Sequence, residues 1–155
     1  MKQFTESHLG VWKKDYLNLL RNERFKLIDE NIWMLGKTDG LICFFLDQEI
    51  SYICYSKSIH KTLKDILDIK KNNELIRLIM IHDLEFSENK LNQKKISKPV
   101  INKLKKIINN FEFSLVKIKS NQVEKITDAF IVVSDPTYNG YTSRLNKIID
   151  NIPKK

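Results

Sequence analysis

The sequence predicts an α+β fold with a small, three-stranded, mainly antiparallel sheet flanked by helices. Two short runs rich in apolar, β-branched and aromatic residues, LICFFL (41–46) and ISYICY (50–55), are separated only by a polar turn, which is typical of a β-hairpin. A third run of this kind, FEFSLVKI (111–118), comes much later in the chain. Most of the other segments carry apolar residues at helical spacing, so few strands alternate with several helices.

Residues 1–39 are predicted to form a helical extension that precedes the main domain, residues 40–155. Apolar side chains from Trp12 to Leu20 recur at helical spacing, which predicts an N-terminal helix with room after it for the start of a second one. The apolar residues 33–35 (WML) indicate a short strand or the lead into one. A Gly-rich turn then leads into the hairpin.

Helices are predicted at residues 58–67, 97–110, 121–133 and 144–150. Residues 75–81 (LIRLIMI) have the composition of a strand and the spacing of a helix, so both remain open. His82 and Asp83, which follow them, are predicted to lie at the end of a strand. Residues 83–96 and 134–140 are rich in polar and turn residues, which predicts two loops.

The charge and composition limit the classes of function. The formal net charge of +8 favours a polyanionic partner, nucleic acid first, although a chain rich in Lys, Asn and Ile can also carry its lysines on faces that are merely solvated. No apolar run approaches membrane-spanning length, so we expect no membrane partner. The first residues lack an apolar signal core, and Cys43 and Cys54 are expected to be reduced thiols, which predicts a cytoplasmic protein.

The hairpin and the segments after it resemble the GIY-YIG nucleases. The first motif falls on Gly40-Leu41-Ile42 and the second on Tyr52-Ile53-Cys54, and a lysine-bearing helix follows. Downstream come a long helix, an F-x-F strand, a helix carrying Glu, and a Pro-x-Tyr-Asn segment at residues 136–139, the order found in many members of the family. The similarity covers about residues 40–141 and implies the fold of that family.

The resemblance implies that water attacks a phosphodiester near hairpin tyrosines, with a helix arginine on the phosphate and a glutamate that binds Mg²⁺ or Mn²⁺. This chain departs from that pattern at the positions of three catalytic groups, and Cys54 stands in place of the glycine of the second motif. The first-motif tyrosine falls on Ile42, or on Cys43 if the register slips by one, and the arginine falls on Thr62. The metal glutamate falls on Thr127. The resemblance therefore implies cleavage that is weakened, rearranged or lost.

Several side chains remain as candidates for the family's chemistry. Tyr52 matches the second tyrosine and Asn139 matches the terminal asparagine, while Lys61 flanks the arginine position. Glu124 and Asp128 lie close to the metal position and are the candidate metal ligands. His60 is a further candidate for proton transfer near neutral pH, although a histidine on a helix surface is more often simply solvated.

The candidate contacts to nucleic acid, with DNA favoured, are Lys57, Lys61, Lys64, Tyr138 and Arg144. The lysines precede or lie on the helix after the hairpin, where they can meet phosphates. Tyr138 is placed either to stack on a base or to pin its own segment. Arg144 lies near the start of the last predicted helix.

Two functions remain open at this stage. The first is a nucleic-acid-binding protein on a GIY-YIG-like endonuclease scaffold, which cuts DNA weakly if it is an enzyme at all. The second is a catalytically inactive protein that acts on a protein partner, as an interaction module or as an inhibitor encoded by a phage or mobile element. A binding module predicts a steep dependence on salt, and a nuclease predicts a requirement for metal.

Overall fold

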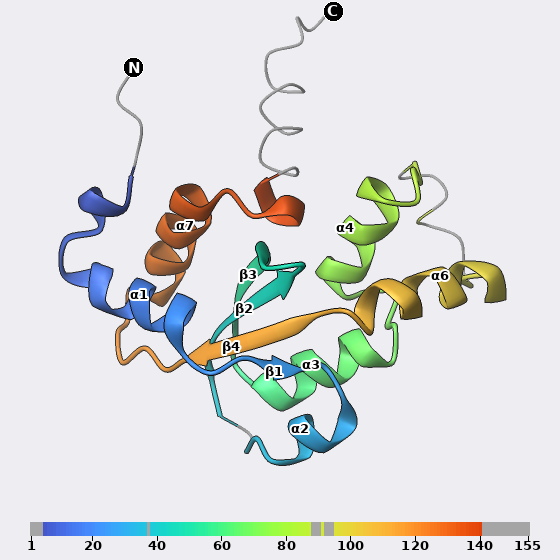
Figure 1. Ribbon diagram of the computed structural model, residues 1–155, viewed down its shortest axis with the longest axis horizontal. Coiled ribbons are helices and arrows are strands. Elements are labelled where there is room, and N and C mark those ends of the chain that lie inside the picture. Colours follow the sequence, from blue (N-terminus) through green and yellow to red (C-terminus); the bar gives the residue numbers. More distant parts are fainter. Residues whose placement is uncertain (1–4, 37, 88–90, 92–94, 141–155) are drawn as a thin grey trace, which may run out of the picture.

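The computed structural model describes residues 5–36, 38–87, 91 and 95–140, which form a four-stranded antiparallel sheet with helices on both faces (Figure 1). The strands are β1 (Phe25–Lys26), β2 (Gly40–Leu46), β3 (Glu49–Ser56) and β4 (Glu112–Val116), in the spatial order β1-β4-β2-β3. The predicted α+β class is confirmed. The predicted count of three strands is wrong, because β1 pairs with the outer side of β4.

The helices of the described residues up to Ser134 are η1 (Glu6–Trp12), α1 (Lys13–Arg21), α2 (Asp29–Trp33), α3 (Ile59–Leu67), α4 (Glu74–His82), α6 (Lys98–Ile108) and α7 (Val123–Ser134). Their buried residues fall into two clusters, one on each face of the sheet. The first core lies under α2, α3, α4 and α6, and the second core lies under η1, α1 and α7. In Figure 1 the two groups of helices stand on opposite sides of the strands.

Strand β2 is the centre of the molecule, with β3 on one side and β4 on the other. Its alternate side chains enter opposite cores: Ile42 and Phe44 pack in the first core, whereas Leu41, Cys43 and Phe45 pack in the second. A strand that is covered on both faces has no polar side to present to water. This burial explains why residues 41–46 form a continuous apolar run.

The β2–β3 connection is a two-residue turn at Asp47 and Gln48, whose φ angles of 51° and 72° lie in the left-handed region. Two positive φ angles are typical of the hairpin turns that match the twist of the strands. The pairing then shifts between Phe44 and Phe45, which oppose Tyr52 and Ile50. The shift leaves one extra residue on β3, so the strand carries a β-bulge.

The predicted boundary between residues 39 and 40 falls between two strands of one sheet. Phe25 of β1 pairs with Phe113 of β4, and Asn22 donates a hydrogen bond from Nδ2 to the backbone oxygen of Leu115. Helix α1 buries Tyr16 and Leu19, and both lie in the second core. The described part of the N-terminal region is thus packed into the same unit as the hairpin.

Outside the sheet, the structure resolves one open alternative and corrects two expectations. The ambiguous segment is helix α4, begun by Asn73, whose Oδ1 accepts from the backbone nitrogen of Ile76 at 3.1 Å. His82 and Asp83 therefore lie at the end of a helix and not of a strand. The expected loop at 134–140 is only a short break after α7, because residues 137–140 are helical.

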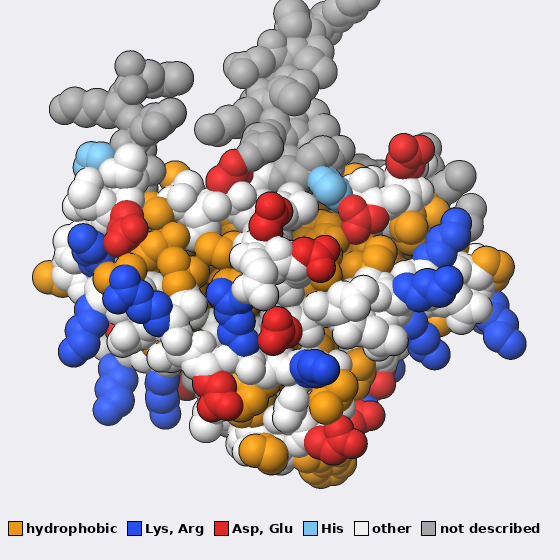
Figure 2. Space-filling view, viewed as in Figure 1, with side chains coloured by type: hydrophobic (Ala, Val, Ile, Leu, Met, Phe, Trp, Pro, Cys, Tyr) orange, Lys and Arg blue, Asp and Glu red, His pale blue; other side chains and the backbone are white. Residues whose placement is uncertain are grey.

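The surface charge is spread over the molecule. In the view of Figure 2, Lys and Arg side chains flank both sides, over α1 and α6, with acidic side chains between them. None of the described helices is long and apolar enough to span a membrane. The positive charge thus does not gather into one patch on this face.

Candidate nucleic-acid interface

Tyr52, the retained tyrosine of the second motif, is a core residue. It is 5% exposed, and its ring centroid lies 5.9 Å from that of Phe44 in the first core. Burial raises the pKa of Tyr52 well above its ordinary value, and the nearby Cys54 and Glu74 raise this pKa further. A buried phenol with a raised pKa keeps its proton at neutral pH and has little access to a solvent-borne substrate.

The two cysteines face opposite cores and are unreactive. Cys43 is fully buried in the second core, while Cys54 is half-buried against the first core. Burial is the main cause that raises the pKa of both thiols to about 12. Neither can serve as a base or nucleophile near pH 7. Ile42, at the other possible tyrosine position, is fully buried and aliphatic.

Asn139 is engaged with the backbone of strand β3. Its Nδ2 donates to the backbone oxygen of Ile53 at 2.7 Å, and its Oδ1 accepts from the backbone nitrogen of Ile53 at 3.2 Å. The side-chain amide thereby pairs with both backbone groups of one residue on an edge strand, as a neighbouring strand would. This contact assigns Asn139 a structural role, since both ends of its amide are used.

Tyr138 pins its own segment to α4. It is 1% exposed, and its hydroxyl donates to Oδ2 of Asp83 at 2.6 Å. The other carboxylate oxygen of Asp83 lies 2.6 Å from Nδ1 of His82, and the His82 and Tyr138 rings meet edge to face. Burial, followed by the contact with Asp83, raises the pKa of Tyr138. Of the two expected roles, pinning fits this geometry, because a buried ring has no free face for a base.

The candidate metal ligands lie on the other side of the sheet from Tyr52. Glu124 and Asp128 are exposed on α7, and the inner side of α7 packs in the second core. Thr127, at the position of the family's glutamate, is buried, and its Oγ1 donates to the backbone oxygen of Val123 at 2.7 Å.

The candidate metal ligands are few and lie apart from the hairpin tyrosine. Across the described ranges, no three His, Cys, Asp or Glu side chains gather as metal ligands. The pair Glu124 and Asp128 supplies two carboxylates on one exposed helix face, on the other side of the sheet from Tyr52. No step of a reaction is therefore routed through a metal at α7.

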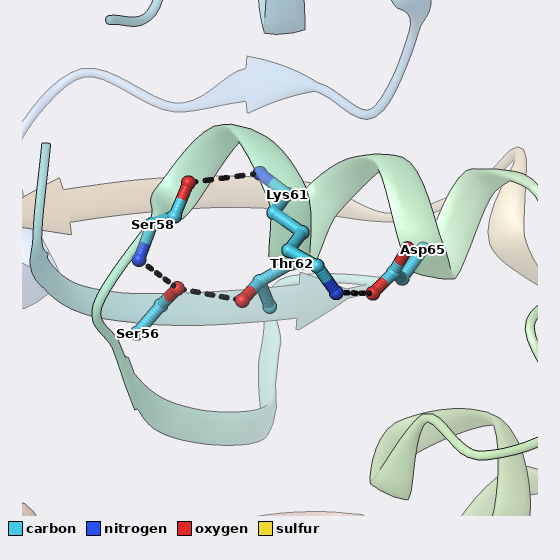
Figure 3. A network of polar contacts seen from close by, with 5 residues as sticks. All are labelled: Ser56, Ser58, Lys61, Thr62 and Asp65. Carbon is cyan, nitrogen blue, oxygen red and sulfur yellow. Dashed lines mark hydrogen bonds and ion pairs between the residues drawn. The ribbon is translucent and has the colours of Figure 1, made fainter. Parts of the chain in front are cut away.

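The turn from β3 into α3 is fixed by hydroxyl groups, as Figure 3 shows. Oγ of Ser56 lies 2.6 Å from Oγ1 of Thr62 and accepts from the backbone nitrogen of Ser58 at 3.1 Å. Oγ of Ser58 caps the helix by accepting from the backbone nitrogen of Lys61. Thr62, at the position of the family's arginine, is thus part of a local network and lies beside the sheet.

The lysines of this region point outward. Lys57 is exposed, and the described residues place no carboxylate within ion-pair distance of it. Lys61 is 77% exposed and bonds Asp65 at 3.1 Å, whereas Lys64 lies between Asp29 and Asp68, at 3.0 and 3.5 Å. The contact with Asp29 is the main cause that raises the pKa of Lys64. Of the three, Lys57 offers the least compensated charge.

An exposed apolar pair lies beside these lysines and was not assigned to the site from sequence. Trp33 ends α2 and Met34 follows it, with exposures of 75% and 77%. The rings of Trp33 and His60 meet edge to face at 5.8 Å, so α2 is joined to the first turn of α3. Residues 33–35 were expected to form a short strand or the lead into one, but Trp33 is the last residue of helix α2. The signal in the sequence for its exposure was a tryptophan with no apolar partner at helical spacing.

The structure thus separates the predicted site residues into two groups. Tyr52, Tyr138 and Asn139 are buried and engaged inside the molecule. The solvent-accessible group is Lys57, His60, Lys61 and Lys64 around the start of α3, which we name the α3 face together with Trp33. Arg144 lies outside the described residues. Comparison of the chain with protein families, with curated proteins and with solved structures finds no match.

Proposed function

We propose that this chain binds nucleic acid, with DNA favoured, through the α3 face of a GIY-YIG-like scaffold that has lost phosphodiester cleavage. One observation carries the proposal: the hairpin keeps its motif residues inside the molecule, while the lysines at and after its end face solvent. Cations on one exposed segment can meet successive phosphates of a polyanion.

The arrangement of the elements supports the scaffold. The order of hairpin, lysine-bearing helix, long helix, F-x-F strand and final helix is the order that the resemblance implies. Gly40, the glycine of the first motif, has a local reason to be glycine. A Cβ at this position would lie 3.0 Å from the backbone oxygen of Val116 and 3.0 Å from Cδ1 of Ile59, which is closer than such contacts normally come.

The positions of the candidate catalytic groups support the loss of cleavage. Proton transfer requires a side chain within hydrogen-bond reach of the reacting atoms, and Tyr52 and Asn139 are enclosed or fully engaged. Glu124 and Asp128 stand across the sheet from the hairpin tyrosine. A single substrate phosphate could not contact both groups in this arrangement.

Binding is tested by fluorescence anisotropy of labelled duplex DNA over a series of salt concentrations. The variant Lys57→Gln/Lys61→Gln/Lys64→Gln should bind more weakly, and its slope of log K against log salt should be shallower by about two to three, since each phosphate contact contributes about 0.9. The matched control replaces three exposed lysines elsewhere, Lys117, Lys119 and Lys125, by Gln.

The control should keep the wild-type slope. Equal losses in both variants would show that the charge acts without a defined surface, and the proposed α3 face would then be wrong. A plasmid-nicking assay with Mg²⁺ or Mn²⁺ tests the loss of cleavage. Nicking that disappears in the Glu124→Gln variant would overturn that part of the proposal.

Action on a protein partner is the second candidate, and Trp33 and Met34 favour it. A tryptophan and a methionine that are both about three-quarters exposed are typical of contact surfaces. The variant Trp33→Ser/Met34→Ser separates the two functions. If Trp33 stacks on nucleic acid, the variant loses DNA affinity, whereas unchanged affinity assigns the pair to another partner.

A further inference from the structure

A groove lies on the first-core side of the molecule, at the far end of α3 from the α3 face. It has a volume of about 480 Å³. It is lined by the aliphatic residues Leu67, Ile69, Ile96 and Ile101 and by the charged residues Asp68, Lys71, Lys95 and Lys105. The aliphatic side chains are buried or half-buried, while Lys95 and Lys105 are exposed. The groove is therefore lined by four aliphatic and four charged side chains.

The charge of the groove is positive and largely uncompensated. Asp68 is the one acidic residue that lines it within the described ranges, and its Oδ1 lies 3.5 Å from Nζ of Lys64. No carboxylate of the described chain lies within ion-pair distance of Lys71, Lys95 or Lys105. Three ammonium groups at one hollow favour an occupant that carries several negative charges.

The groove continues into a second hollow of about 210 Å³. The two hollows share Lys71, Lys95 and Ile96, and the second adds the apolar side chains of Met80, Phe86 and Leu91. Two adjoining hollows with lysines common to both offer apolar side chains at two places of one site. Such a site suits a chain with two apolar anchors better than one compact small molecule.

We propose that this groove binds an extended acidic segment of a partner protein. Apolar side chains of the segment enter the two hollows, and its carboxylates meet Lys71, Lys95 and Lys105. Nucleic acid fits the larger hollow less well, because four aliphatic side chains line it and none of its lining residues is aromatic; Phe86, in the smaller hollow, is the one aromatic ring that lines the site. The groove lies at the C-terminal end of α3 and the α3 face lies around its first turns; Lys64 of the α3 face pairs with Asp68 of the groove, so the test variants leave both residues unchanged.

The test uses the full chain and a short fluorescein-labelled peptide of alternating leucine and glutamate, followed by anisotropy. One control peptide replaces leucine by serine, and the other replaces glutamate by glutamine. The double variant Lys71→Glu/Lys105→Glu should weaken binding of the first peptide by about tenfold or more. The matched variant Lys103→Glu/Lys106→Glu has the same change in charge on exposed positions of α6 outside the groove, and it should bind as the wild type does.

Both control peptides should bind more weakly than the leucine–glutamate peptide, since each lacks one half of the complementarity. Equal weakening in the two double variants would overturn the proposal, as would a serine peptide that binds as tightly as the leucine peptide. A labelled single-stranded oligonucleotide forms the last arm. If Lys71→Glu/Lys105→Glu abolishes oligonucleotide binding and leaves peptide binding unchanged, the groove serves nucleic acid and the proposal is wrong.

Discussion

The β2–β3 hairpin and helix α3 are consecutive in the sequence, but their candidate site residues differ in solvent exposure. The hairpin places Tyr52 in a core beside Phe44, and its edge is occupied by Asn139. The first turn of α3 leaves Lys61 77% exposed, next to an exposed Trp33. The residues that resemble catalytic groups therefore contribute to stability, and the residues that can meet a ligand lie on the adjoining helix.

A comparison within β3 supports this division. Tyr52 and Tyr55 are three positions apart and project to opposite cores. Tyr55 is only half-buried, and its hydroxyl donates to Oδ2 of Asp39 at 2.9 Å near the surface. Exposure of a tyrosine on this strand is thus set by what covers that face, and not by its place in a motif.

The largest effect is expected from removing the ring of Tyr52. Tyr52→Ala should lower the free energy of unfolding by about 3–5 kcal/mol, because it opens a cavity in the first core. Tyr52→Phe keeps the ring and should cost no more than about 1 kcal/mol. Urea denaturation measures both. Tyr55→Ala is the control and should cost clearly less; similar losses at the two positions would contradict the contrast drawn within β3.

Asn139→Ala should have the next largest effect. The substitution leaves the backbone nitrogen and oxygen of Ile53 without their partner at a buried edge, which should cost about 2–3 kcal/mol of unfolding free energy. Chemical denaturation measures the loss. Asn110→Ala, which removes an exposed hydrogen bond to the backbone of Lys106, is the matched control and should be nearly neutral. If Asn139→Ala matched that control, the amide would be free for another role.

Tyr138→Phe should cost about 1–2 kcal/mol near pH 7, since it removes the bond to Asp83 from a buried site. The pKa of Tyr138 is raised in the folded protein, so its stabilising effect is complete below pH 10 and is lost as the pH rises further. Above pH 10 the unfolded chain releases this proton first, and wild-type stability should fall more steeply than that of the variant, by about 1.4 kcal/mol per pH unit. Parallel pH curves for the two proteins would contradict this.

The smallest effect on stability is expected on the α3 face. Lys61→Gln removes one exposed ion pair with Asp65, which contributes little to folding in water. We expect the unfolding transition to stay within experimental error of the wild type, while DNA affinity falls. Thermal denaturation and anisotropy on the same sample give both values. A variant that unfolds earlier but binds DNA normally would reverse the roles assigned to the two regions.

The sequence predicted those helices and strands whose apolar residues recur at a clear helical or strand period. The hairpin, β4, α6 and α7 lie where the apolar spacing placed them. Strand β1 was not predicted, because its two residues, Phe25 and Lys26, are too few to show a hydrophobic period. The strand is defined by its pairing with β4. The apolar segment of α4 stayed ambiguous because helices and strands that are buried all round look alike in sequence.

The candidate site was predicted less well than the fold, for a physical reason. Residue type and spacing identify groups that are able to do chemistry, but access depends on packing partners elsewhere in the chain. The side-chain amide of Asn139 is hydrogen-bonded to the backbone of Ile53, 86 positions away. The hydroxyl of Tyr138 is hydrogen-bonded to Asp83, 55 positions away. The apolar side of α3 is clear in its sequence, and Ile59, Leu63 and Ile66 are buried as that spacing predicts; the predicted contacts of its lysines with nucleic acid stay a prediction.

The sequence by itself determined the α+β class, the hairpin, the basic charge and the side of α3 that faces water, because each follows from local period, turn chemistry or composition. Only the tertiary structure decided that Tyr52 is enclosed and that Asn139 completes an edge strand. It also decided that Glu124 and Asp128 stand across the sheet from the hairpin tyrosine. These are relations between distant segments, and the packing of two cores on one sheet sets them.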